Sequence, residues 1–306
     1  MEIGIELIPN ERCDRIVEYA VLAEKSGFDF VWVTEHYNNR SPYPILSLIA
    51  HRTSSMKIGI GVTNPYTMHP ALIASNAMTI DEISGGRTIL GISAGDMMTL
   101  RSIGIKRERS LRRIREAVEI IRLLFKERNV TYKGEIFSLE NAEMSFFREV
   151  PIYIGAQGKK MIELGLEIGD GVMINSSNPE DFRGLKGFKK KVIACTAVCV
   201  DDDVRRAKRI ARIVVGYIIA GSPRSVLEEK GIDLDRVKEI RDIIKSRRFE
   251  RLDIEDELLD EFCIYGDMRS VASRIKEFAD VVDQVVIGGP IARDKYKVIK
   301  EIVRYI

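Results

Sequence analysis

The stretch of sequence that decides the fold runs from residue 28 to residue 65 and reads FDFVWVTEHYNNRSPYPILSLIAHRTSSMKIGIGVTNP. Phe28–Thr34 is a continuous apolar run, which is typical of a parallel strand buried on both faces. A helical pattern near Pro44–Arg52 and a second strand pattern at Lys57–Thr63 follow it. A strand, a helix and another strand in this order predict a right-handed βαβ unit in a parallel sheet.

The same alternation continues along the whole chain. We predict strands at Glu2–Leu7, Phe28–Thr34, Lys57–Thr63, Thr88–Ser93, Pro151–Gly155, Gly171–Ile174, Val192–Val200 and Gln284–Ile287. We predict helices at Cys13–Ser26, Pro44–Arg52, Pro70–Ser84, Arg107–Arg128, Lys159–Ile168, near Pro179–Lys190, and at Val204–Ala220, Met268–Ala279 and Ala292–Tyr305. Eight such units in a chain of 306 residues match a (β/α)8 TIM barrel, and we predict one domain spanning residues 1–306.

Two segments do not fit the repeat. Val130–Leu139 alternates and contains Lys133-Gly134, which predicts a hairpin insertion. Ser222–Phe262 is charged and helical, and we predict a helical excursion before the last unit. A doubly wound open sheet is the alternative fold, but no G-x-G-x-x-G motif follows the first strand.

The composition excludes several classes of protein. The net charge is +2, from 48 basic and 46 acidic residues, so we expect neither a nucleic acid nor a membrane as partner. No apolar run reaches the ~18 residues of a membrane span, and we see no signal peptide, so we expect a cytoplasmic protein. The four cysteines lack metal-ligand spacing, and we expect Cys195 and Cys199 to face the core and no metal site to form.

Two carboxylates are candidates for proton transfer. In a barrel of this kind, the C-terminal strand ends meet at one mouth. Glu6 lies among Ile and Leu near the end of the first strand, where burial would raise its pKa towards neutrality and suit it to donate a proton. Asp96 follows the fourth strand and either caps the next helix or faces the same mouth. A local cap or ion pair is the alternative for Glu6.

The loops after the second and third strands are candidates for binding a ring. Glu35 and His36 follow the second strand and could position a ring or relay a proton, although ordinary loop polarity is the alternative. The third strand ends in glycines, which mark a bulge or a place where a ligand approaches closely. This segment comprises Gly61, Val62, Thr63 and Asn64, followed by Pro65.

Two further loops offer donors for an anion. Small residues before a helix expose backbone N–H groups, and the helix N-terminus adds partial positive charge, so phosphate is the natural ligand. Either run could instead be an ordinary βα loop. The first run comprises Gly155, Ala156, Gln157 and Gly158, and the second Asn175, Ser176 and Ser177.

Taken together, the segments HYNN, GVTNP and GAQG, in this order, resemble the archaeal coenzyme F420-dependent methylenetetrahydromethanopterin reductases of the luciferase-like superfamily. The resemblance covers almost the whole chain. It implies a barrel that binds a 5-deazaflavin, coenzyme F420, in its mouth, with a non-prolyl cis peptide at Gly61-Val62 behind the ring. It also implies hydride transfer to a pterin substrate, whose methylene carbon becomes a methyl group, in one-carbon metabolism.

The resemblance also assigns roles to the candidate residues. Glu6 would be the acid that opens the five-membered ring of the substrate, and Asp96 would support it. The deazaflavin ring would be lined by Glu35, His36, Val62 and Thr63, and its phosphate and tail would be held by residues 155–158 and 175–177. Members of the superfamily are dimers or tetramers, so we expect a homodimer or homotetramer.

Three departures from the family touch the pocket and its rim. Glutamate stands before His36 where the family has aspartate, Met97 stands where it has lysine, and Asp181–Val192 is shorter. We therefore keep three alternatives: an F420-dependent paralogue with another substrate such as an alcohol, an FMN-dependent monooxygenase, and a non-catalytic flavin-binding or deazaflavin-binding paralogue.

Overall fold

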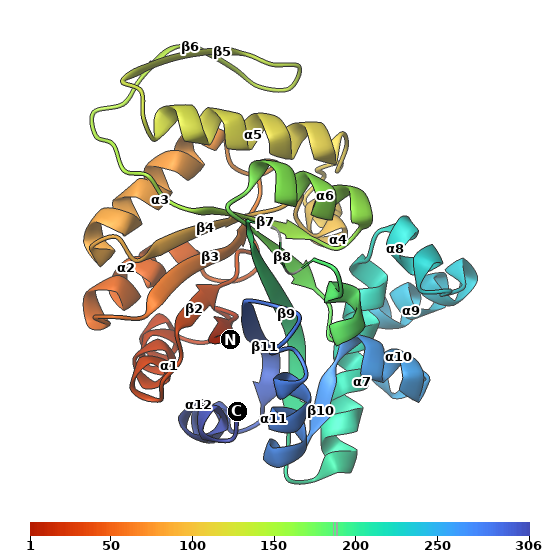
Figure 1. Cartoon of the computed structure of the whole chain (residues 1–306). Coiled ribbons are helices and arrows are strands. Elements are labelled where there is room, and N and C mark those ends of the chain that lie inside the picture. Colours follow the sequence, from red (N-terminus) through yellow and green to blue (C-terminus); the bar gives the residue numbers. More distant parts are fainter. Residues whose placement is uncertain (186, 188) are drawn as a thin grey trace.

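Eight parallel strands close into a barrel (Figure 1). The structure is a computed structural model that describes residues 1–185, 187 and 189–306. The barrel order is β1-β2-β3-β4-β7-β8-β9-β11, and pairing of β11 with β1 closes it. The barrel strands are β1 (Glu2–Leu7), β2 (Phe30–Val33), β3 (Lys57–Thr63), β4 (Thr88–Ile92), β7 (Ile152–Ala156), β8 (Gly171–Asn175), β9 (Lys191–Val200) and β11 (Gln284–Ala292). The predicted fold is confirmed.

The strands are buried on both faces, as their apolar sequences predict. One face of each strand packs against the surrounding helices, and the other points into the barrel. The inner cluster includes Phe30, Trp32, Ile89, Tyr153, Met173, Ile193 and Val286. The barrel is therefore a packed core below its mouth, not a channel.

Trp32 explains the glycine inside the third strand. A Cβ at Gly59 would lie 2.1 Å from Cε3 of the Trp32 ring, and a Cβ at Gly61 would lie 3.0 Å from the same atom. The sequence suggested that these glycines make room for a ligand or a bulge. At Gly59, the structure shows that the room is taken by the indole of Trp32, which is 1% exposed.

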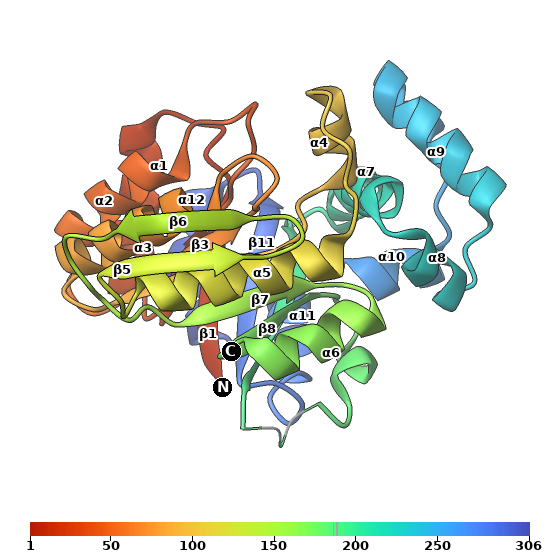
Figure 2. The same cartoon turned by 90° about the horizontal axis from the view of Figure 1, so that it is seen from above.

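Helices surround the barrel. The helices of the repeat are α1 (Cys13–Lys25), α2 (Pro42–Arg52), α3 (Pro70–Ser84), α4 (Met97–Ser102), α5 (Ser110–Leu124), α6 (Lys159–Ile168), α7 (Val204–Gly221), α11 (Met268–Lys276) and α12 (Lys295–Glu301). The predicted hairpin forms from β5 (Asn129–Lys133) and β6 (Ser138–Glu143) and lies outside α5 (Figures 1 and 2). The carboxylate of Glu116 on α5 accepts hydrogen bonds from three backbone N–H groups in the turn between β5 and β6, which fixes the hairpin to the helix.

The predicted helical excursion also forms. It comprises α8 (Arg224–Glu229), α9 (Leu234–Ser246), the short 3-10 helix η2 (Phe249–Arg251) and α10 (Asp256–Phe262). These helices pack on α7 around a second apolar cluster, to one side of the barrel in Figure 1. The short strand β10 (Ile264–Gly266) then pairs with the end of β9 outside the barrel order.

Several predicted boundaries were wrong. The basic helix is shorter than Arg107–Arg128, and α4 precedes it as a separate helix. The last strand continues past Ile287 to Ala292 through a register shift. The helix predicted near Pro179–Lys190 is only a 3-10 turn, η1 (Pro179–Phe182), and Lys186 and Phe188 of that prediction lie outside the described residues. A further 3-10 turn, η3 (Ile302–Arg304), follows α12.

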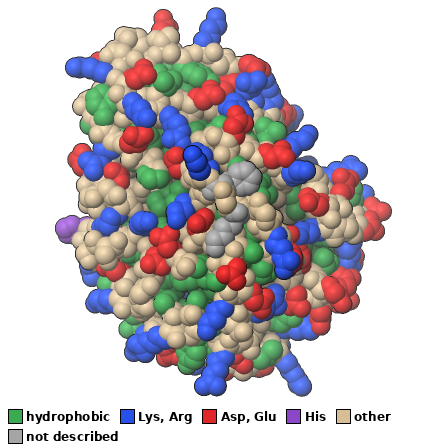
Figure 3. Space-filling view, viewed as in Figure 1, with side chains coloured by type: hydrophobic (Ala, Val, Ile, Leu, Met, Phe, Trp, Pro, Cys, Tyr) green, Lys and Arg blue, Asp and Glu red, His purple; other side chains and the backbone are tan. Residues whose placement is uncertain are grey.

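Charges of both signs are mixed over the face shown in Figure 3, without a large patch of one sign. This distribution agrees with the near-balanced composition. Within the described ranges, no helix is both long enough and apolar enough to cross a bilayer.

Candidate active site

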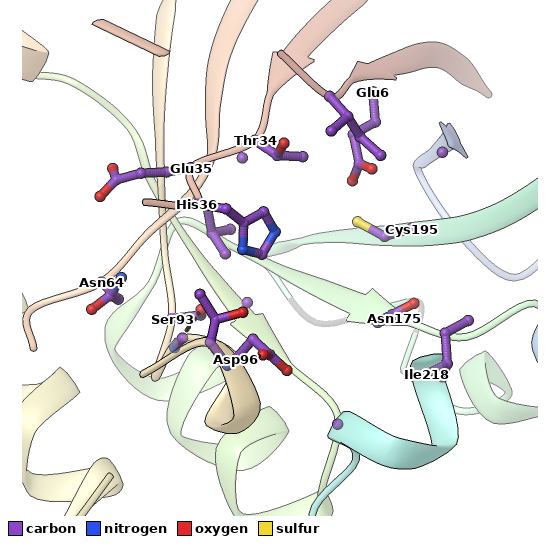
Figure 4. Close-up of a pocket in the computed structure, with 18 of the residues that line it drawn as sticks. Glu6, Thr34, Glu35, His36, Asn64, Ser93, Asp96, Asn175, Cys195 and Ile218 are labelled. Carbon is purple, nitrogen blue, oxygen red and sulfur yellow. Dashed lines mark hydrogen bonds between the residues drawn. The ribbon is translucent and has the colours of Figure 1, made fainter. Parts of the chain in front are cut away.

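A cavity of about 1710 Å³ lies at the C-terminal ends of the barrel strands. Every barrel strand, or the residue directly after it, contributes to its lining: Glu6, Thr34, Gly61, Ser93, Gly155, Asn175, Cys195 and Gly288. Figure 4 shows most of these side chains converging on one space. The convergence follows from the parallel sheet, because all strands then end at the same edge.

Glu6 is a protonatable group at the floor of this cavity. Burial raises the pKa of its carboxyl to about 7, although the backbone N–H of Gly289 donates to it and favours the ionised form. The thiol of Cys195 faces Glu6, and burial together with that carboxylate raises the pKa of Cys195. Glu6 can therefore exist as an acid near neutral pH, as the sequence predicted.

Asp96 has both of the roles considered for it. Its Oδ1 accepts the N–H of Thr99 at 2.6 Å and caps α4, while the residue also lines the cavity. His36 lies between Glu6 and Asp96 in Figure 4. Burial lowers the pKa of His36, and the charge of Asp96 partly opposes that change. A neutral imidazole is thus favoured beside the two carboxyl groups.

Glu35 points away from His36 (Figure 4). Tyr43 Oη donates to its carboxylate at 2.9 Å and lies 3.1 Å from Thr63 Oγ1. Burial raises the pKa of Glu35 despite these hydrogen bonds. Glu35 therefore ties the loop after β2 to the end of β3 and does not form a pair with the imidazole.

The end of β3 carries the bulge that the sequence predicted. The Gly61-Val62 peptide is cis, as the family resemblance implied, and the register with β4 shifts between Ile60 and Thr63. The methyl groups of Val62 fill space left by two glycines: a Cβ at Gly91 would lie 2.9 Å from Val62 Cγ1, and a Cβ at Gly155 3.3 Å from it. Val62 thus stands as an apolar surface within the cavity.

The turn after the bulge is fixed by Asn64. Its side-chain oxygen accepts the backbone N–H groups of Tyr66 and Thr67, both at 3.1 Å. Arg113 on α5 donates to the carbonyl of Pro65 at 3.2 Å and stacks over Tyr66. The turn is therefore held by its own side chain and by the neighbouring helix.

The loop after β7 lines the cavity and leads directly into α6. Gly158 is the N-cap of this helix, and no side chain within the described part of the chain caps it. Lys159 and Lys160 follow, are exposed and border the cavity. Free N–H groups, the helix dipole and two lysines make this edge suitable for an anion.

Three predicted residues do not line the cavity. Thr63 is fully buried beside Tyr43. Ser176 Oγ donates to Asp181 at 2.6 Å, and Ser177 Oγ donates to the carbonyl of Phe262 at 3.0 Å. These two hydroxyls are committed to the protein, so their placement does not support a direct contact with phosphate. The twelve remaining candidates line the cavity: Glu6, Glu35, His36, Gly61, Val62, Asn64, Asp96, Gly155, Ala156, Gln157, Gly158 and Asn175.

Sequence reasoning missed several lining residues. Cys195 was expected in the core but faces the cavity, because β9 presents it on the inner face above Ile193. The Gly288-Gly289 bulge within β11 was also missed, although it directly follows Ile287, the predicted end of that strand, and could have been found by that position. The apolar side formed by Ile213, Tyr217 and others of α7 had no signal of its own in the sequence. Among the described residues, no cluster of metal-ligating side chains occurs.

Comparisons with known proteins find similar enzymes and similar structures. The chain is 45% identical to the 5,10-methylenetetrahydromethanopterin reductase of Archaeoglobus fulgidus, over 98% of this chain and 97% of that protein. It is 42% identical to the enzyme of the same name from Methanolobus tindarius, over 98% of each chain. The solved structure of coenzyme F420 dependent tetrahydromethanopterin reductase from Methanopyrus kandleri matches with a TM-score of 0.85 and 35% identity, over 98% of this chain and 96% of that one.

The fold is shared more widely. An F420-dependent secondary alcohol dehydrogenase matches with a TM-score of 0.81 at 21% identity, which shows the fold alone. Residues 2–284 match the luciferase-like monooxygenase family, and the chain therefore belongs to that family.

Proposed function

We propose that the protein is a coenzyme F420-dependent methylenetetrahydromethanopterin reductase. It would transfer a hydride from the reduced coenzyme to methylenetetrahydromethanopterin and release methyltetrahydromethanopterin. The observation that carries the proposal is the 45% identity to a reductase of that name across 98% of the chain. Because loops and insertions differ most between functions on one fold, a match that spans 98% of this chain and 97% of that protein, loops included, supports the same chemistry.

The cavity suits a flat ring with an anionic tail. Val62 offers an apolar face at the bulge of β3, and the hydroxyl of Thr34 is buried without a hydrogen-bond partner among the described residues. The uncapped start of α6, with Lys159 and Lys160, offers donors and positive charge to the tail. The bound coenzyme would supply the hydride, and the protein would supply orientation and proton transfer.

Glu6 would supply the proton. Reduction of a methylene carbon that bridges two nitrogens breaks one C–N bond, adds the hydride to carbon and adds a proton to the released nitrogen. With a pKa of about 7, Glu6 is protonated in a large part of the population at neutral pH and can donate that proton. Asp96 and the neutral His36 line the same part of the cavity and would orient the substrate nitrogen.

An equilibrium titration with two cofactors tests this proposal. Purified protein would be titrated with coenzyme F420 and, separately, with FMN, and oxidation of reduced F420 would then be followed with methylenetetrahydromethanopterin present. Binding of F420 and substrate-dependent oxidation are expected. F420 binding without turnover would contradict the substrate assignment, and a preference for FMN would contradict the cofactor assignment.

We also propose that residues 1–306 act as one domain and that copies associate. Two helices rich in apolar residues, α2 and α3, expose large apolar side chains to water. Leu48 on α2 is 49% exposed, and on α3 Leu72 is 60% and Ile83 45% exposed. A homodimer or homotetramer that covers these side chains would remove them from water. Light scattering of the wild type and of Leu72→Glu tests this, since the substitution should shift the mass towards the monomer. A cytoplasmic location stays a prediction from the sequence.

A further inference from the structure

We infer that Lys230 is a positioning residue. It holds the helical excursion against the loop after β8. In this way it fixes the outer wall of the cavity, formed by Pro223, Ser225 and Glu229, where the coenzyme tail would bind. This inference rests on the proposed function for the identity of the tail. The juxtaposition itself comes from contacts between three parts of the chain that lie far apart in sequence. These parts are the loop after β8, the end of α8 and the end of α10.

Lys230 forms two ion pairs at the junction. Its Nζ lies 2.7 Å from Asp181 Oδ1 in the turn after β8 and also pairs with the carboxylate of Glu261 on α10. The side chains of all three residues are largely shielded, with 22%, 28% and 18% of their surface exposed. Burial lowers the pKa of Lys230, but its hydrogen bonds to both carboxylates outweigh this and raise it overall, so the lysine stays charged.

The loop after β8 completes the junction. Ser176 Oγ donates to the second oxygen of Asp181, and the amide of Asn178 donates to Glu261 at 2.7 Å. Ser177 Oγ bridges two elements, since it donates to the carbonyl of Phe262 on α10 and accepts the N–H of Ala197 on β9. The polar run that the sequence suggested for phosphate binding therefore anchors the excursion to the barrel.

The anchored wall borders the predicted site for the tail. Pro223, Ser225 and Glu229, at the start and end of α8, line the cavity. Ser225 Oγ would lie 3.6 Å from a Cβ at Gly158, so α8 begins directly beside the N-cap of α6. Lys230 follows α8 and is the only lysine among the described residues of the excursion that pairs with the barrel side of this junction.

Loss of the ammonium group would leave two shielded carboxylates facing each other. Removing one partner of a shielded ion pair is destabilising, because the remaining charges are only partly solvated and are no longer compensated. The two carboxylates would move apart, and α8 would lose its link to the loop after β8. Glu6, His36 and Val62 belong to other strands and would keep their positions, so binding would suffer and the chemical step would not.

The experiment compares Lys230→Met with Lys208→Met. Lys208 on α7 pairs with Asp256 on α10 at 2.6 Å, so its loss loosens the same excursion without touching the loop after β8. Lys230→Met should raise the dissociation constant and KM for coenzyme F420 about tenfold, with kcat within about twofold, the pattern for lost binding that is equal in ground and transition states. Lys208→Met should change neither constant by more than about twofold, and Lys230→Arg should restore most of the affinity.

Hydrogen–deuterium exchange separates this inference from the proposed function. Amides of residues 175–181 and 224–230 should exchange faster in Lys230→Met than in Lys208→Met, whether or not the coenzyme binds. If the wild type fails to bind F420 but this exchange pattern appears, the proposed function fails and the anchoring stands. If Lys230→Met does not fold, Ser176→Ala, which removes one bond to Asp181, should raise KM by a smaller factor. Unchanged exchange or unchanged affinity in a folded variant would overturn the inference.

Discussion

The floor and the outer wall of the cavity are held in different ways. At the floor, Trp32 packs against Gly59, and Val62 packs against Gly91 and Gly155. At the outer wall, Lys230 forms ion pairs with two carboxylates. The floor is thus fixed by shape, with glycines placed where any side chain would collide. The wall is fixed by the ion pairs of Lys230 and by serine hydroxyl groups, which join the loop after β8 to the helices of the excursion. We conclude that close packing sets the geometry of the groups that we propose to react, and that polar contacts set the position of the wall that we propose to meet the ligand.

The largest effect should come from Glu6→Gln on the floor. It removes the ionisable group and keeps its shape, so turnover should fall about 100- to 10,000-fold while the affinity for coenzyme F420 changes little. Steady-state turnover and a binding titration measure the two effects. Glu229→Gln, a carboxylate on the wall, is the control and should keep its turnover. Unchanged turnover in Glu6→Gln would remove Glu6 from the mechanism.

Gly59→Ala tests whether the floor depends on shape. Its Cβ would lie 2.1 Å from the Trp32 ring, and overpacking of this kind costs about 3 kcal/mol of stability. Unfolding in denaturant measures the loss. The matched control is Gly158→Ala, whose Cβ would meet nothing closer than 3.5 Å. Equal stability of the two variants would show that the ring can move aside, contrary to our description of the floor.

The pH dependence tests the floor by another route. Only the protonated form of Glu6 can donate, so turnover should fall as the pH rises above its pKa of about 7, about tenfold per pH unit well above it. Folding raises this pKa from 4.5, so protons favour the folded state, and stability should fall as the pH rises from 4.5 to about 7. A pH profile of turnover and of denaturant unfolding should show both trends. In Glu6→Gln the fall in turnover should disappear and the fall in stability should shrink, the remainder coming from Glu35, whose pKa burial also raises. If the turnover of Glu6→Gln still falls as the pH rises, a titratable group other than Glu6 causes that fall.

The smallest effect should come from Tyr43→Phe, at the boundary between packing and polar contacts. It removes the hydroxyl that donates to Glu35 and lies beside Thr63, and leaves a shielded carboxyl without that donor. The expected loss is about 1–3 kcal/mol in the free energy of unfolding. Tyr37→Phe is the control, because Tyr37 is 56% exposed and its hydroxyl takes part only in an exposed hydrogen bond, which it accepts from Ser102. If both variants match the wild type, Glu35 does not depend on this hydrogen bond.

The sequence predicted the repeat well because its signals are local. Apolar runs such as Phe28–Thr34 and the glycine pair after Ser84 report strand burial and helix ends without knowledge of distant residues. A predicted boundary was wrong where a contact between residues far apart in the sequence determines the end of the element. β11 extends beyond Ile287 because it pairs with the outer end of β9. The short helix α4 is a different case, since its cap, Asp96, is local and the helical pattern there was overlooked.

The sequence predicted which residues of the candidate site lie at strand ends, but not in which direction their side chains point. Position at a strand end brought Glu6, Asp96 and Gly155 to one cavity, because parallel strands share an edge. Ser176 and Ser177 have the same local signal, yet their hydroxyls bind Asp181 and Phe262. No local pattern distinguishes a hydroxyl that faces a ligand from one that faces the protein.

The sequence by itself determined the barrel, the cavity at its mouth and the acid on its floor, since periodicity and strand order follow from neighbouring residues. Only the tertiary structure decided that Trp32 fills the space at Gly59, that Glu35 turns to Tyr43 instead of His36, and that Lys230 anchors the outer wall. Each of these depends on side chains from separate elements, and their meeting is fixed by close packing and by the cost of leaving buried charges unpaired.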